Sequence, residues 1–296
     1  MFVLIGIGIV MGSILMGFTM HGGKVAALMQ YTEFIIIGGA GFGSVVVANG
    51  FKGATGVIKA SIGLLKGNPY TEKVFLELLQ VMYEIFTISR VEGLLSLEKH
   101  AESPKDSEIF QKYPSFLHNH AGVDLFADTL KIVVMGGVGI YDLADMMDID
   151  LEIREHEAMK TSHILTTIAD SMPGFGIVAA VLGVVITMAA IGGPPEVIGE
   201  KVGAALVGTF LGILLAYGIF APMSKACEGI AACEGQYLAC IKNAVVAFAR
   251  GDAPLICVEF ARRNIDPELR PSFTEMENAC RNRNKAEGGG EAAKAA

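Results

Sequence analysis

The stretch VGAALVGTFLGILLAYGIFAPMS, residues 202–224, decides the fold class of this chain. It contains no Asp, Glu, Lys or Arg, and it exceeds the roughly 20 apolar residues with which an α-helix crosses a hydrocarbon core of about 30 Å. Three more stretches without Asp, Glu, Lys or Arg, each of about this length, lie at 1–23, 34–51 and 171–195. We therefore predict an all-α, polytopic membrane protein with four transmembrane helices and a helical cytoplasmic domain.

The composition of the 296 residues agrees with this prediction. Hydrophobic residues make up 52% and charged residues 18%, whereas a soluble domain usually has about 25% charged residues. These values argue against an ordinary cytosolic enzyme and against a disordered chain. The net charge of −8, with no basic tract, excludes a nucleic-acid-binding surface. The first stretch lacks a basic segment ahead of it, so we interpret it as a retained span rather than a signal peptide.

The distribution of Lys and Arg predicts the orientation, because both are enriched in cytoplasmic segments. Only Lys24 lies between the first two spans and only Lys201 between the last two, while 21 of the 23 lie in the two remaining segments. We therefore expect both termini in the cytoplasm. The expected organisation is transmembrane helices at 1–23, 34–51, 171–195 and 202–224, a cytoplasmic helical domain at 52–170, and a cytoplasmic helical segment with a tail at 225–296.

The cytoplasmic segments show helical patterns. Thr71 is an expected N-cap, and Pro104 is expected at the first position of a short helix. A strongly charged segment, 148–160, is expected to continue as a helix into the third span. The other expected helices cover 71–99, 104–110, 122–147 and 225–250, and residues 285–296 are expected to fray.

Asp, Glu, Lys and Arg are missing from the four predicted spans, and Glu33 is expected at the outer edge of the second. The polar residues at depth cannot hold and release a proton near neutral pH. A proton path therefore needs a carboxylate from another chain. The alternative is that each hydroxyl simply bonds a carbonyl one turn back in its own helix. These polar residues are Ser13, Ser44, Asn49, Thr187, Thr209 and Tyr217.

Prolines and glycines indicate how the spans bend and pack. Pro173 and Pro222 stand at the cytoplasmic ends of the third and fourth spans, where each breaks a backbone hydrogen bond. They form either a paired hinge or two ordinary kinks. The GxxxG spacing predicts close helix contacts, and it occurs at Gly8 and Gly12, Gly39 and Gly43, and Gly208 and Gly212.

Neither a metal site nor a cofactor site is predicted, and enzyme activity has no support. The five Cys include no CxxC pair, and His156-Glu157 is not followed by the second His of an HExxH motif. The glycines of residues 39–43 lie inside a predicted span, which excludes a dinucleotide-binding loop.

Several motifs resemble the motility protein A family, the flagellar stator subunits. The most specific is ALVGTFLGILLAYG at 205–218, followed by Pro222, and SMPGFGIVAAV at 171–181 is similar as well. Arg90, Ser96-Leu97-Glu98 and the RPSF motif at 270–273 also fit, in the family's order. The resemblance covers nearly the whole chain.

The resemblance implies a proton-driven torque generator of the bacterial inner membrane, serving motility and chemotaxis. It implies a pentamer of this subunit around a motility protein B dimer, whose membrane aspartate accepts the transported H⁺, and cytoplasmic helices that push the rotor switch protein FliG. No cofactor is implied. The implied ion-path and hinge residues are Pro173, Pro222, Thr209, Ala180 and Tyr217, and the implied rotor-interaction residues are Arg90, Glu98 and Asp150.

Two positions depart from patterns within the family. Sodium-driven relatives carry Thr where this chain has Ala180, and losing an oxygen ligand weakens a Na⁺ site while leaving a proton path intact. We therefore expect protons. Asp150 stands where the family often has Glu, so the charge is kept and only its reach changes.

Two other functions remain open. An energiser of the ExbB/TolQ type also couples proton flow to a partner, but such chains typically have three spans and a different loop order. A membrane scaffold without ion flow would leave Arg90 and Glu98 as ordinary solvated charges and would tolerate substitution of Thr209.

Overall fold

The computed structural model describes residues 2–189 and 191–281, and within them the chain forms helices and no strand. The chain divides into two compact units. The first comprises the chain up to Asn68 together with Ala158–Gly229, and the second comprises Pro69–Glu157 and the chain from Ile230 onward. Helices α8 (Ile140–Met188) and α10 (Ala221–Ala249) contribute to both units. The predicted all-α fold is confirmed.

The first unit is built from the apolar helices. Its elements are α1 (Phe2–Met20), η1 (Val25–Leu28), α2 (Tyr31–Leu65), the last part of α8, α9 (Pro195–Ile213), the π-helix η4 (Leu214–Phe220) and the first part of α10. Within the part of the chain that the structure describes, four helical segments are long and apolar enough to cross a membrane. They overlap the four predicted spans and are Val3–Met20, Val25–Leu65, Ile140–Met188 and Pro195–Ala249.

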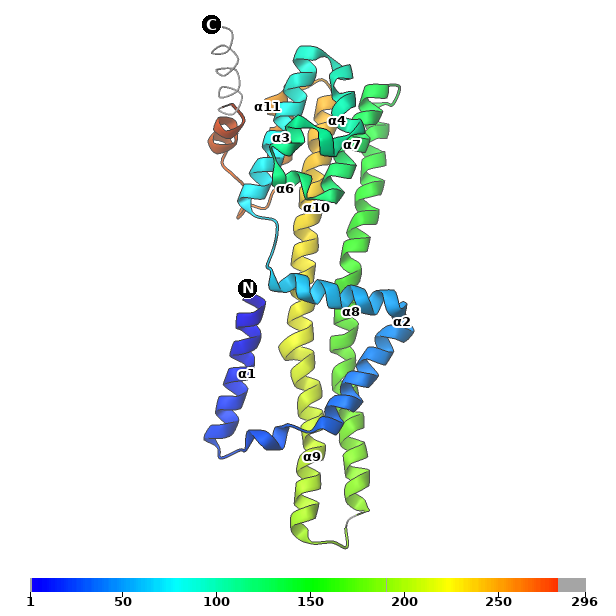
Figure 1. The fold of residues 1–296 in the computed structure, drawn as a ribbon, viewed down its shortest axis with the longest axis vertical. Coiled ribbons are helices and arrows are strands. Elements are labelled where there is room, and N and C mark those ends of the chain that lie inside the picture. Colours follow the sequence, from blue (N-terminus) through cyan, green and yellow to red (C-terminus); the bar gives the residue numbers. More distant parts are fainter. Residues whose placement is uncertain (1, 190, 282–296) are drawn as a thin grey trace. The chain divides into compact units, whose positions relative to one another are not determined.

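Helix α2 continues beyond the predicted end of the second span. Gly50 has a φ of +65°, which L side chains rarely adopt, and it bends the helix into the two limbs seen in Figure 1. After the bend, Lys52 and Lys59 are exposed while Ala54 and Val57 are buried. The charge-free stretch ends before Lys52 because the second limb of the helix is amphipathic and carries charged residues on its exposed face. The predicted boundary at 51/52 is therefore a change of direction inside one helix.

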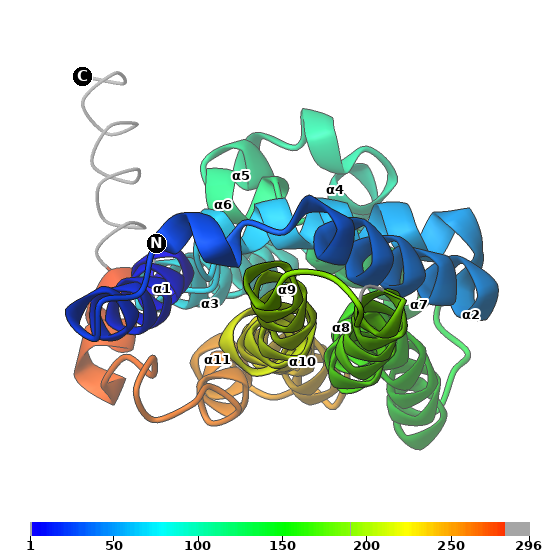
Figure 2. The same ribbon diagram turned by 90° about the horizontal axis from the view of Figure 1, so that it is seen from below.

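Helices α8 and α9 lie side by side, as Figure 2 shows in a view along their axes. A methyl group at Gly176 would lie 2.9 Å from the carbonyl oxygen of Gly208, and one at Gly212 would lie 2.6 Å from the carbonyl oxygen of Met172. Only glycine allows backbones to approach so closely, so the contact predicted for Gly208 and Gly212 is confirmed. Among the described residues, methyl groups on the other predicted pairs would meet nothing within 4 Å; these are Gly8, Gly12, Gly39 and Gly43.

The second unit has a large aromatic and aliphatic core. The rings of Phe86 and Phe248 stack with centroids 4.5 Å apart, and Phe110, Phe116 and Phe126 pack edge to face or tilted beside them. Besides parts of α8 and α10, its elements are α3 (Glu72–Glu92), η2 (Leu94–Leu97), α4 (Glu98–Glu102), η3 (Pro104–Asp106), α5 (Glu108–Gln111), α6 (Pro114–Leu117), α7 (His120–Met135) and α11 (Pro254–Arg262).

Glycines divide two helices that were predicted to be continuous. The predicted helix 71–99 ends at Glu92 because Gly93 has a φ of +91°. The predicted helix 122–147 is split where Gly136 and Gly137 have φ values of +69° and +84°. Positive φ is incompatible with the right-handed helix. Apolar periodicity on both sides of these glycines hid the breaks.

The remaining helix predictions hold in part. Thr71 is the residue before α3 but makes no side-chain cap. Pro104 opens only a 3-10 turn, and Ser107 caps the short α5 by accepting a hydrogen bond from the amide of Phe110. The charged segment 148–160 continues into the third span as α8, and 225–250 is helical in α10, as predicted. The tail 285–296 lies outside the described residues.

Candidate ion path and rotor-facing residues

Ala180 and Thr209 lie on facing stretches of α8 and α9 in the first unit. The backbone nitrogen of Ala180 is 3.2 Å from the position that a methyl group on Gly208 would occupy, and Gly208 immediately precedes Thr209. Both Ala180 and Thr209 are half-buried. The α8–α9 crossing therefore places Ala180 against Gly208, the residue next to Thr209 in the chain.

The hydroxyl groups in the apolar helices differ in their hydrogen bonds. Thr187 donates to the carbonyl oxygen of Gly183 at 2.8 Å, and Ser44 donates to that of Gly41 at 2.8 Å. The hydroxyl of Thr209 has no hydrogen-bond partner among the described residues. Bonding within the same helix therefore explains Thr187 and Ser44 but leaves Thr209 with a free donor and free acceptor lone pairs.

Pro222 follows a break in regular helix geometry. It stands in the first turn of α10, directly after the π-helix η4 that contains Tyr217. Proline has no N–H for the carbonyl of Gly218, and its ring crowds that carbonyl, so the preceding turns widen. Single-turn π-helices of this kind concentrate at functional sites. Tyr217 is 69% exposed.

Pro173 lies inside α8 next to the close crossing with α9. It removes the hydrogen bond to the carbonyl of Ala169. The preceding residue, Met172, has its carbonyl oxygen against Gly212. The structure thus places Pro173 where α8 touches α9, while Pro222 lies beyond the π-helix that follows α9. Their action as a paired hinge stays a prediction.

A polar cluster joining α8 to α10 was missed in the sequence. The hydroxyl of Ser224 donates to the carbonyl oxygen of Ser162 at 2.9 Å and lies 2.7 Å from the hydroxyl of Thr166. The hydroxyl of Ser162 also lies 3.1 Å from the carbonyl oxygen of Ser224. Ser162 and Ser224 are buried. The sequence signal for this cluster was the pair of hydroxyl residues, Ser162 and Thr166, that precede the predicted third span.

Glu33 lies at the outer end of the second span, as predicted, but it is buried there. It lies in the first turn of α2 and is only 5% exposed. Its Oε2 atom is buried without a hydrogen-bond partner among the described residues, and a methyl group at Gly208 would lie 2.6 Å from it. The first unit therefore does contain a packed carboxyl group, beside the residue that precedes Thr209.

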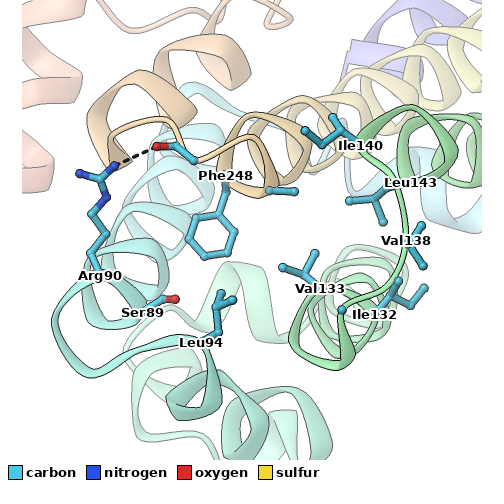
Figure 3. Close-up of a pocket in the computed structure, with 12 residues that line it drawn as sticks. Ser89, Arg90, Leu94, Ile132, Val133, Val138, Ile140, Leu143 and Phe248 are labelled. Atoms are coloured by element: carbon cyan, nitrogen blue, oxygen red, sulfur yellow. Dashed lines mark hydrogen bonds between the residues drawn. The ribbon is translucent and has the colours of Figure 1, made fainter.

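Arg90 lies at the rim of a pocket of about 350 Å³ in the second unit. Figure 3 shows its side chain turned toward the end of α10, where Nη2 donates a hydrogen bond to the carbonyl oxygen of Gly251 at 2.9 Å. Apolar side chains, among them Leu94 and Phe248, line the pocket beside it. Arg90 is exposed, but its guanidinium group is held by the chain itself.

Glu98 and Asp150 have different surroundings. Glu98 is exposed in the first turn of α4, where a negative charge complements the helix N-terminus. Asp150 is half-buried in α8 and accepts a hydrogen bond from Nε of Arg154 at 3.0 Å. Within the described ranges, no ion pair joins Arg90, Glu98 and Asp150 to one another. They are therefore three separate charges on the second unit.

A buried histidine follows Glu98 by two residues. Nδ1 of His100 lies 2.7 Å from the hydroxyl oxygen of Ser107, the cap of α5. Burial is the main cause that lowers the pKa of His100, and the positive charge of Lys99 lowers it further. The neutral ring therefore supports the cap beside the exposed Glu98. Metal binding has no candidate here, because no group of three or more His, Cys, Asp or Glu in the described ranges is placed to hold a metal ion.

The comparisons with known proteins identify the family of the chain. Residues 4–93 match the family model "Motility protein A N-terminal", and residues 119–237 match "MotA/TolQ/ExbB proton channel family". Motility protein A of Salmonella typhimurium is 38% identical over 281 residues, covering 95% of both chains. The chain belongs to the motility protein A family. Motility protein A of Escherichia coli is 37% identical over the same share of both chains.

The motility protein A fold is also shared with solved structures. A chain of the Campylobacter complex titled "Structure of C. jejuni MotAB" aligns with a TM-score of 0.74 at 20% identity, covering 91% of this chain and 98% of that one. The family model that groups MotA with TolQ and ExbB covers only the part that these groups share. The match of residues 4–93 to the motility protein A model distinguishes this chain from the ExbB/TolQ alternative.

Proposed function

We propose that this chain is the proton-conducting, torque-generating stator subunit of a bacterial flagellar motor, a role that is not enzymatic. One observation carries the proposal. The two family motifs, 171–181 and 205–218, meet at the glycine-lined crossing of α8 and α9, and Thr209 emerges from it with an unpaired hydroxyl. A membrane scaffold does not require a polar group to be left unpaired at a close helix crossing.

The proposal includes the partners. A similar chain occurs in a solved complex titled MotAB. We propose that this chain forms a pentamer around a motility protein B dimer in the inner membrane, with both termini in the cytoplasm, and that its second unit acts on the rotor switch protein FliG. Four apolar segments support a multi-pass arrangement.

Protons are the proposed ion. Ala180 lies beside Gly208 and has no side-chain oxygen that could bind an ion together with the hydroxyl of Thr209. A Na⁺ site needs several oxygen ligands. The partner's aspartate accepts the proton, and its neutralisation changes the contacts at Pro173 and Pro222. Arg90, Glu98 and Asp150 on the second unit are the proposed rotor-interaction residues.

Proton flux tests the proposal. The chain is expressed alone and with a motility protein B partner whose plug is removed, and acidification of the cell interior is measured. We expect flux only with the partner, and loss of flux when the partner's membrane aspartate is replaced by asparagine. Absence of flux despite verified co-assembly would favour the scaffold function, and flux from the chain alone would contradict the need for a partner carboxylate.

A further inference from the structure

The carboxyl group of Glu33 lies in the contact between α2 and the α8–α9 pair. Its Oε2 occupies the space that a side chain at position 208 would fill, and Ala179 closes the same space, with its Cβ 3.1 Å from that position. The backbone amide of Glu33 donates to the carbonyl oxygen of Gln30 at 3.1 Å, so the first turn of α2 holds the residue in place. Glycine at position 208 makes room for this carboxyl group.

The surroundings of this carboxyl group contain little charge. The titratable or charged residues nearest in sequence on the elements packed there are Lys24 before η1, Tyr31 of α2, Glu200 and Lys201 of α9, and Asp170 of α8. Lys201 precedes Gly208 by seven residues, which is about 10 Å along a helix. Among the described residues, none of these groups forms an ion pair or hydrogen bond with Glu33.

Such a site discriminates between the two forms of a carboxyl group. Burying an ionised carboxylate whose oxygen has no hydrogen-bond partner is unfavourable, so the buried position of Oε2 suits the protonated form. The N-terminus of α2 favours the ionised form, because its unpaired amides carry partial positive charge. Opposing effects of this kind allow a group to bind a proton and release it again.

We propose that Glu33 is a proton-binding residue of this subunit on the path of the transported proton, an inference that rests on the proposed function. An O–H bond forms on a carboxylate oxygen of Glu33 as an O–H bond of a hydronium ion breaks and leaves water, and the reverse transfer to a second water molecule releases the proton as hydronium. The site lies beside Gly208, the residue that precedes Thr209 in α9, and the hydroxyl of Thr209 is free to accept or donate a hydrogen bond.

The geometry favours a proton over a metal cation. A proton needs a single lone pair, whereas Na⁺ and Ca²⁺ need several oxygen ligands. Among the described residues, Glu33 belongs to no group of three or more His, Cys, Asp or Glu that could hold a metal ion.

Glu33→Gln in the complex with an unplugged motility protein B partner tests the inference. A positioned proton-transfer group typically contributes about 10²-fold or more to a rate, so we expect flux to fall by at least about tenfold. We expect Glu33→Asp to retain flux with an altered pH profile. Glu196→Gln is the matched control, because Glu196 is an exposed glutamate in the first turn of α9. Each variant is first quantified in the membrane and by co-purification with the partner.

Infrared difference spectroscopy of the wild-type complex gives a second readout that packing alone would not move. Lowering the pH should produce the C=O stretching band of a protonated carboxyl group. We expect this band to shift in Glu33→Asp and to stay unchanged in Glu196→Gln. If the wild-type complex conducts protons and Glu33→Gln conducts them equally with the same pH profile, the inference is overturned. The proposed function then stays intact. Absence of a band that responds to Glu33→Asp would overturn it even if Glu33→Gln failed to assemble.

Discussion

Arg90 donates a hydrogen bond from its guanidinium group to the carbonyl oxygen of Gly251, 2.9 Å away. The bond ties the last turn of α3 to the turn that follows α10. Gly251 has a φ of +92°, so a left-handed turn directs its carbonyl toward Arg90. A residue predicted to act on the rotor thus also fixes the structure of its own unit, and substitutions at Arg90 combine the two effects.

Arg90→Ala should therefore loosen the turn between α10 and α11. An exposed hydrogen bond of this type contributes about 1 kcal/mol or less, so we expect local opening rather than unfolding. Hydrogen–deuterium exchange should rise in residues 251–257 of Arg90→Ala and stay unchanged there in Glu98→Ala. Equal exchange in both variants would mean that Arg90 acts only through its surface charge.

Thr209→Val should lower proton flux without reducing assembly, because it removes a hydroxyl that forms no hydrogen bond with any described residue. Thr187→Val is the matched control, since the hydroxyl of Thr187 is already bonded to Gly183. Flux with an unplugged partner, normalised to the membrane level of each variant, provides the measurement. Equal losses in the two variants would assign the effect of Thr209→Val to packing.

Pro173→Ala and Pro222→Ala should slow swimming while leaving membrane levels unchanged. Each restores a backbone N–H and relieves a clash, so α8 straightens or the π-helix Leu214–Phe220 tightens to α-helix. Pro195→Ala serves as control because Pro195 opens α9, where a helix requires no N–H. Normal swimming speed for both variants would contradict the hinge.

Ala180→Thr should not by itself allow sodium to drive the motor. It adds one hydroxyl oxygen beside Gly208, and a Na⁺ site needs several ligands. Swimming speed is measured with and without sodium, at equal membrane levels. A sodium-dependent gain in speed from this single change would show that the remaining ligands are already in place.

The second unit should lose stability as the pH falls. Burial lowers the folded-state pKa of His100 below its ordinary value of about 6.5, so the unfolded state binds a proton more readily. The free energy of unfolding is therefore largest above about pH 6.5 and decreases as the pH is lowered through it toward the folded pKa. Melting temperatures of the purified complex should show this slope, which His100→Gln should reduce and the exposed-site control His118→Gln should keep.

The sequence predicted the apolar helices well because a charge-free stretch is a direct requirement for crossing a membrane. It predicted helix ends poorly where glycine sets them. Gly50 bends α2 and Gly136 separates α7 from α8, yet each lies in a stretch whose apolar pattern continues. Helix periodicity reports which face is buried, and it does not report the sign of φ at a single residue.

Candidate residues could be chosen from the sequence where their type stands out, and not where their environment depends on distant neighbours. Pro173, Pro222 and Thr209 could be chosen from the sequence, because a missing N–H or a hydroxyl in an apolar stretch is visible there. The burial of Glu33 depends on Gly208, which is far away in the chain. The bond from Arg90 to Gly251 depends equally on a distant turn.

The glycine contacts between α8 and α9 have a mechanical consequence. Where Gly176 meets Gly208 and Gly212, no layer of side chains lies between the two backbones, so rotamer changes cannot absorb a displacement there. A shift of α9 at Thr209 must be passed to α8 at Met172 almost undiminished. We expect the crossing of the two helices to move as one stiff body during each cycle of ion uptake and release, so that bending is left to the missing hydrogen bond at Pro173 and to the π-helix before Pro222.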